Sequence, residues 1–164
     1  MISEIVGQEM KCAIEYGRTD IVKAILDACD HGDLRSDNNK NKLCLLNGDL
    51  TDEGSFLCLA SKLNRTDIVR TLLAAGADPN VCNKQGHKPL QLATSENTKH
   101  TFVEELLRAI ANSQLSRTDQ LVTAGVNVNT WDSVTTQNTP LHWAACYADK
   151  HLVSYLLDQG ANVN

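Results

Sequence analysis

The chain has 164 residues, with 15 Lys or Arg against 20 Asp or Glu and a net charge of −5. This length suits one domain with a continuous core. The acidic balance argues against nonspecific binding to nucleic acid or anionic membranes, because phosphate contacts require clustered basic side chains. No apolar run reaches the ~18 residues of a transmembrane helix, and the N-terminal residues lack the apolar core of a secretory signal. Six cysteines without a CxxC pair predict free thiols in the reducing cytoplasm or nucleus.

Residues 1–30 contain a degenerate first copy of a unit that recurs along the chain. Ala13 and the string Arg-Thr-Asp-Ile-Val at 18–22 line up with Ala60 and the same string at 65–69. The spacing between these two copies is 47 residues, and the excess lies in the polar stretch 31–53. Such a composition predicts an exposed loop insertion. We expect part of it to pack back on the domain through three of its leucines, Leu43, Leu45 and Leu46.

The second copy, residues 54–81, matches the last copy, residues 130–164, closely. Phe56 to Asn80 aligns with Pro140 to Asn164 without a gap. Self-similarity at a fixed period is typical of repeat architectures. The matched pairs include Leu57 and Leu141, Ala60 and Ala144, Val69 and Val153, Leu72 and Leu156, Leu73 and Leu157, and Gly76 and Gly160.

Each copy predicts two short helices. Proline at 89 and 140 presets φ for the first turn of a helix, where its missing N–H costs nothing. Gly76 and Gly160 end second helices, because glycine adopts the left-handed conformation at little cost. Apolar residues at helical spacing form one stripe on the second helix of the second copy. These residues are Ile68, Val69, Leu72 and Leu73.

The third copy, residues 82–129, is irregular. Its second helix has an apolar stripe from Phe102 to Leu107, but no glycine ends it, and eighteen residues beyond the usual period follow. One account is a lengthened helix plus a short extra helix over 116–124. Another treats 106–129 as a compressed repeat of its own. We favour the first account, because both flanking copies keep their alignment.

Residues 139–144 read Thr-Pro-Leu-His-Trp-Ala and are followed by a Leu-Leu pair and by Gly-Ala-Asn-Val-Asn. This order and spacing resembles the ankyrin repeat, a unit of about 33 residues with a β-turn and two antiparallel helices. The resemblance implies an all-α solenoid of about four repeats with short β-turn fingers over residues 1–164, two of its connections carrying insertions. It also implies that His142 hydrogen-bonds backbone groups between repeats. Because Lys88 and Gln91 replace the usual Thr and His, we expect the third turn to lack the standard hydrogen bonds.

The resemblance implies a protein–protein interaction module without catalysis, cofactor or metal, and we expect a monomer. The five histidines are dispersed, and no phosphate-binding glycine loop or nucleophile motif occurs. The apolar last helix predicts either a partner covering it or further repeats, and we favour the N-terminal part of a longer protein. The alternative function is the targeting arm of a larger enzyme, or of a pathogen effector in host cytosol, whose catalytic domain lies elsewhere.

Ankyrin repeats bind partners through turn tips and the exposed faces of first helices, which line a concave groove, so the resemblance places the candidate contacts there. Three of only seven aromatic residues, Trp131, Trp143 and Tyr147, fall in the last copy, and Trp and Tyr are enriched at binding hot spots. Alternatively, Trp143 packs on a neighbouring repeat and Trp131 covers the extra helix. The candidate partner-binding residues are Leu59, Lys62, Lys84, Gln85, Gln91, Trp131, Asp132, Val134, Trp143 and Tyr147.

Asn80 is a candidate modification site. The segment from Leu72 to Asn80 resembles the substrates of the cytosolic asparagine hydroxylase that modifies ankyrin turns. This motif is nearly built into the fold, so we favour a plain turn role for Asn80.

Overall fold

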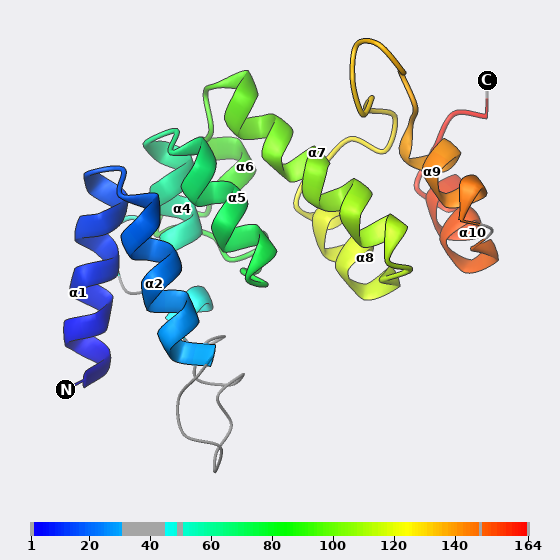
Figure 1. Cartoon of the computed structure of the whole chain (residues 1–164). Coiled ribbons are helices and arrows are strands. Elements are labelled where there is room, and N and C mark those ends of the chain that lie inside the picture. The colour runs from blue at the N-terminus through cyan, green and yellow to red at the C-terminus, as the bar shows by residue number, and fades with distance from the viewer. Residues whose placement is uncertain (1, 31–44, 49–50, 148, 164) are drawn as a thin grey trace. The chain divides into compact units, whose positions relative to one another are not determined.

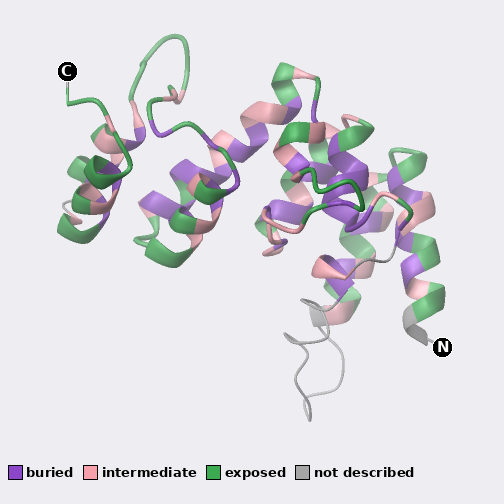
Figure 2. Ribbon diagram, turned by 180° about the vertical axis from the view of Figure 1, so that it is seen from behind, coloured by how far each residue is buried: buried purple, intermediate pink, exposed green. Residues whose placement is uncertain are grey.

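The computed structural model describes residues 2–30, 45–48, 51–147 and 149–163 (Figure 1). Its elements are helices joined by tight turns, together with one isolated β-bridge between Thr51 and Gly54. Most of the predicted loop insertion, residues 31–44 and 49–50 with Leu43, lies outside the described residues. The chain divides into two compact units, Met1–Lys99 and His100–Asn164. In each unit, buried residues lie on the helix faces that meet one another, and exposed residues lie on the turns and on the outer helix faces (Figure 2).

The first unit is a stack of antiparallel helix pairs. Helix α1 packs against α2 and α4, α2 packs against α5, and α4 also packs against α5 and α6. The stacking follows from the apolar stripes, because each helix pair covers the apolar face of the next. The helices of this unit are α1 (Ile2–Glu15), α2 (Thr19–Asp30), α4 (Phe56–Lys62), α5 (Thr66–Ala74) and α6 (Pro89–Leu92).

The turns inside the first two helix pairs share one geometry. The Arg18 N–H donates to the Ala13 carbonyl at 2.8 Å, and the Arg65 N–H donates to the Ala60 carbonyl at 2.9 Å. The repeated sequence string therefore marks a repeated turn. Gly76 ends the second pair at φ 101°, in the left-handed region expected for it.

Polar side chains in these turns connect one helix pair to the next. The Arg65 guanidinium donates to the carbonyl of Ile14 at 3.2 Å, which adds a second donor to a carbonyl at the C-terminus of α1 that also accepts the Gly17 N–H. The Asn64 amide oxygen accepts the N–H groups of Thr94 and Ser95 at 3.1 and 2.9 Å. Each pair is thus tied to its neighbour by hydrogen bonds as well as by apolar packing.

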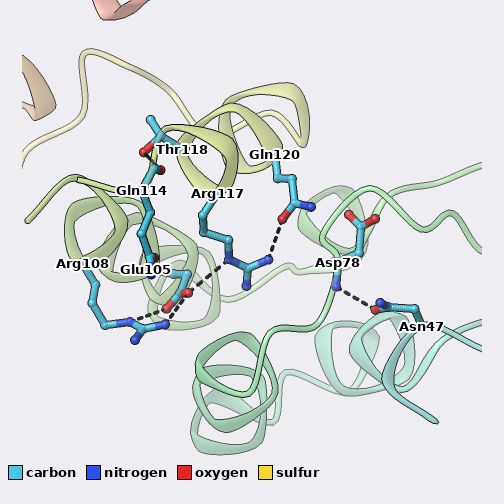
Figure 3. Close-up of polar contacts among 8 residues, drawn as sticks. All are labelled: Asn47, Asp78, Glu105, Arg108, Gln114, Arg117, Thr118 and Gln120. Carbon is cyan, nitrogen blue, oxygen red and sulfur yellow. Dashed lines mark hydrogen bonds and ion pairs between the residues drawn. The ribbon is translucent and has the colours of Figure 1, made fainter. Parts of the chain in front are cut away.

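The described end of the loop insertion returns to the first unit, as predicted. Leu45 and Leu46 are buried, and the Asn47 amide oxygen accepts the Asp78 N–H at 2.8 Å (Figure 3). In the second unit, the Asn129 amide oxygen accepts the Asn162 N–H in the same way at 2.7 Å. Asn47 therefore closes the first repeat as Asn129 closes a later one, and the extra residues lie within the first repeat.

Helix α6 of the third copy has only four residues. The expectation that its turn lacks the standard hydrogen bonds is wrong in part. The Gln91 side-chain oxygen accepts the Lys88 N–H at 2.8 Å, as the His142 ring Nδ1 accepts the Thr139 N–H at 3.1 Å. The Gln91 amide oxygen and the His142 ring nitrogen thus accept the same N–H, that of the residue just before the helix.

The irregular segment contains both predicted parts, a lengthened helix and an extra helix. Helix α7 (Glu96–Ala111) crosses the division between the units, and α8 (Leu115–Thr123) follows it. The Gln114 N–H donates to the Ala109 carbonyl at 2.9 Å, which repeats the bond from the Asp149 N–H to the Ala144 carbonyl at 3.2 Å. The end of α7 and α8 therefore also form a repeat-like pair, so both accounts of this segment are partly right.

The second unit continues with α9 (Pro140–Cys146) and α10 (Lys150–Asp158). When the two helix pairs are aligned on their shared turn, Ala109 corresponds to Ala144. In the same alignment Glu105 corresponds to Pro140, and Arg117 corresponds to Leu152. Thus an ion pair occupies positions that are apolar in the last repeat.

Among the described residues, no helix is both long and apolar enough to cross a lipid bilayer.

The ion pair belongs to a small, partly buried cluster (Figure 3). Glu105 is 5% exposed and pairs with Arg117 at 3.3 Å and with Arg108 at 2.6 Å. The Arg117 guanidinium also donates to the Gln120 side-chain oxygen at 2.9 Å. A buried carboxylate requires such partners, because removing an unpaired charge from water costs several kcal/mol.

Candidate partner-binding surface

The tip of the last repeat, residues 131–138, is organised around one carboxylate. Asp132 Oδ1 accepts hydrogen bonds from the Ser133 N–H at 2.7 Å, the Asn138 N–H at 2.9 Å and the Thr136 hydroxyl at 2.6 Å. These donors, the Thr136 hydroxyl foremost, lower the pKa of Asp132 from 3.8 to about 2. The tip therefore carries a fixed negative charge at neutral pH.

The preceding tip in the first unit has the same design with an amide in place of the carboxylate. The Asn83 side-chain oxygen accepts the N–H groups of Gln85 and His87 at 3.1 and 2.9 Å. Asn and Asp side chains commonly hold turns in this way. The last tip has two more residues between its Asp132 and Pro140 than the preceding tip has between Asn83 and Pro89.

Helix α9 and its C-cap residue contribute two aromatic side chains beside this tip. The Trp143 indole Nε1–H donates to Asp132 Oδ2 at 3.3 Å. One helical turn further on, the Tyr147 ring stacks on Trp143, with centroids 6.2 Å apart and an interplanar angle of 25°. The structure therefore brings three predicted site residues, Asp132, Trp143 and Tyr147, into one contiguous arrangement.

Apolar side chains in this repeat remain open to solvent. Trp131 is 53% exposed, Val134 is 84% exposed and Tyr147 is 52% exposed, whereas Trp143 is half-buried. Trp131 and Val134 flank Asp132 within the tip itself. We call the surface formed by Trp131, Asp132, Val134, Trp143 and Tyr147 the aromatic tip.

The remaining predicted contact residues lie in the first unit. Lys84 and Gln85 are exposed on the preceding tip. Lys62 is exposed and forms an ion pair with Glu53. Gln91 is exposed, although its side-chain oxygen already caps α6.

Leu59 requires a correction. Its side chain is only 6% exposed, so it belongs to the core and offers no surface to a partner. The physical reason is that α4 is an internal helix, which packs against α1 on one side and against α5 and α6 on others. In a stack, a first-helix position that is open at a terminal repeat becomes buried between two neighbours.

Asn80 is a half-buried turn residue whose N–H donates to the Asp78 carboxylate at 2.9 Å. His142 has a structural role, because its ring accepts the Thr139 N–H at the start of α9, but this bond lies within one repeat and not between repeats as expected. Within the described segments, no three His, Cys, Asp or Glu side chains lie together in a way that could hold a metal ion.

Sequence reasoning missed the residues that hold the aromatic tip in place. Thr136 and Asn138 fix the Asp132 carboxylate, and Asp132 in turn holds the Trp143 indole. The sequence did contain a signal, because Asp132 and Asn83 each lie in a tip that precedes a helix beginning with proline. An Asx residue in such a turn commonly accepts hydrogen bonds from the following backbone.

A family model for three copies of the ankyrin repeat matches residues 57–164. The chain belongs to the ankyrin-repeat family. Among curated proteins, it is similar to the neurogenic locus notch homolog protein 1 of Cricetulus griseus, Mus musculus and Rattus norvegicus, at 29% identity over 125 residues in each case. The match covers 65% of this chain, and the chain spans only about 5% of the length of those relatives. Ankyrin-repeat domains are generally protein–protein interaction modules and are typically non-catalytic.

Proposed function

We propose that this ankyrin-repeat chain recruits a protein partner through the aromatic tip. The observation that carries the proposal is that Trp131 and Val134, two exposed apolar residues, lie in the loop organised by Asp132, whose carboxylate also accepts the Trp143 indole N–H, with the exposed Tyr147 ring stacked on Trp143. Trp and Tyr are enriched among interface hot spots, because they bury a large area with few rotatable bonds.

The fixed geometry of the tip supports the proposal. Three donors hold Asp132 Oδ1, and the Trp143 indole and the Tyr147 ring are held by a hydrogen bond and by stacking. Binding to such a surface requires little ordering of side chains, which otherwise costs about 0.5–1.5 kcal/mol for each immobilised side chain. Little of the free energy gained by burying the aromatic rings is therefore lost to ordering them, and the rest contributes to affinity.

We further propose that the exposed polar residues of the first unit contribute weaker partner contacts of their own. These side chains are long and polar, and side chains at the rim of an interface typically change affinity little when truncated. We expect their individual substitution to have a smaller effect than substitution of Trp131. The residues are Lys62, Lys84, Gln85 and Gln91.

An affinity capture from cell lysate, read by mass spectrometry, tests the proposal. The bait proteins are wild type, Trp131→Ala and Tyr16→Ala; Tyr16 is the matched control because it is also an exposed aromatic residue (79%), but lies in the first repeat. We expect one partner to be retained by wild type and Tyr16→Ala and lost with Trp131→Ala. Retention of every partner by a folded Trp131→Ala protein would place the binding surface elsewhere.

A further inference from the structure

The aromatic tip carries a negative charge that the second unit does not neutralise. Residues 100–164 contain three Lys or Arg against six Asp or Glu. Two of the three, Arg108 and Arg117, pair with Glu105. Asp132 forms no ion pair with any residue in the described part of the chain. A partner that meets this surface therefore meets an uncompensated carboxylate.

The two oxygens of this carboxylate are used unequally. Oδ1 accepts three short hydrogen bonds, whereas Oδ2 accepts only the Trp143 indole N–H, at the longer distance of 3.3 Å. A carboxylate oxygen has two lone pairs, so Oδ2 retains the capacity to accept a further donor. That donor would have to approach beside the Trp143 ring.

The Trp143 ring is itself a favourable neighbour for a cation. The face of an indole ring is electron-rich and attracts Lys or Arg, with Trp the best of the aromatic side chains for this interaction. A hydrogen bond from the indole N–H to an anion adds electron density to the ring and strengthens this attraction. The carboxylate and the aromatic pair thus select the same kind of group.

We infer that the aromatic tip binds a cationic side chain, arginine in preference to lysine, presented by a partner segment that also carries an apolar residue. This inference rests on the proposed function. A planar guanidinium can lie against an indole and donate to Asp132 Oδ2 at once, whereas an ammonium group is a compact point charge. The apolar residue of the partner packs on Trp131 and Val134, which are exposed on the same tip.

The test uses random twelve-residue peptides displayed on phage and selected against the complete chain. The strongest peptide is then synthesised with its cationic residue intact and with citrulline, which keeps the shape of arginine without its charge. Both peptides are titrated against wild type, Asp132→Asn and Trp131→Ala. Asp132→Asn is a suitable variant because Asn83 holds the preceding tip with an amide oxygen, and circular dichroism confirms that each variant folds.

We expect the selected peptides to share an Arg beside an apolar residue, and peptides that carry Lys in its place throughout would overturn the preference for arginine. The citrulline peptide and the Asp132→Asn protein should each bind at least about tenfold more weakly than their parents, and raising the salt concentration should weaken the parent pair. Neutral or acidic peptides that lose binding with Trp131→Ala would overturn the cationic preference and leave the proposed function standing. Peptides that bind both variants as well as wild type, or failure to enrich any peptide, would overturn both.

Discussion

Replacing Arg117 with leucine tests whether the ion pair between Glu105 and Arg117 stabilises the second unit. The pair lies where the last repeat has Pro140 and Leu152. The Arg117→Leu variant removes one of the two cations that neutralise Glu105. Breaking a buried pair costs about 3–5 kcal/mol when the remaining charge is stranded. Here Arg108 still contacts both carboxylate oxygens. We therefore expect a loss near that of one hydrogen bond to a charged group, about 2 kcal/mol.

The second variant in this series removes both charges. Replacing a buried ion pair with apolar residues is often neutral or stabilising. We expect the double variant Glu105→Leu with Arg117→Leu to recover most of the stability that Arg117→Leu loses. Arg108→Leu is the matched control, since the Arg108 side chain is 49% exposed and its loss should cost about 1 kcal/mol or less.

Urea unfolding followed by tryptophan fluorescence measures these changes. Both tryptophans, Trp131 and Trp143, lie in the second unit, so the signal reports on the unit that contains the ion pair. Two results would refute the reasoning. One is an Arg117→Leu protein as stable as wild type. The other is a double variant whose loss equals the sum of the losses of Arg117→Leu and of the single variant Glu105→Leu, which is measured beside it, because independent sites add and coupled ones do not.

Two further predictions concern the turns. Gly54→Ala should destabilise the chain by about 2 kcal/mol or more, because Gly54 has φ 96° and an added Cβ would lie 2.9 Å from the Asn83 Cα. Gly86→Ala should cost only about 1 kcal/mol, because no atom lies within 4 Å of its added Cβ. Thermal unfolding measures both variants, and equal losses would contradict the role of the close contact. The pKa of Asp132 is lowered in the folded chain, so its contribution to stability is present above about pH 3.8 and is lost as the pH falls through about 2. The indole N–H resonance of Trp143 should shift over that range, and a resonance that stays constant down to pH 2 would count against the hydrogen bond to Asp132.

The sequence was sufficient for the parts of the fold that repeat. Ala60 and Ala144 accept equivalent backbone bonds in equivalent turns, and Gly76 and Gly160 both have positive φ. These residue types are constrained by local backbone geometry, and local geometry recurs with the period. The helix pair ending at Gly125 was harder to identify, because its first helix is continuous with the preceding one and lacks the Thr-Pro start.

The contacts that the sequence did not reveal depend on neighbours outside the repeat period. Leu59 was predicted to be exposed but is buried, because α4 has a packed helix on more than one side. Arg117 looks like a solvent-exposed residue of an amphipathic helix, but Glu105 stabilises it at a core position. The bond between Trp143 and Asp132 depends on the conformation of a tip that is two residues longer than its counterpart.

The affinity of the captured partner for three forms of the chain tests the central claim most directly. Calorimetric titration of wild type, Trp131→Ala and Tyr16→Ala compares an exposed aromatic residue of the aromatic tip with one in the first repeat. If the aromatic tip is the binding surface, Trp131→Ala loses about 2 kcal/mol or more, roughly 30-fold in Kd, while Tyr16→Ala stays within about twofold. Wild-type affinity of a folded Trp131→Ala protein would contradict the account.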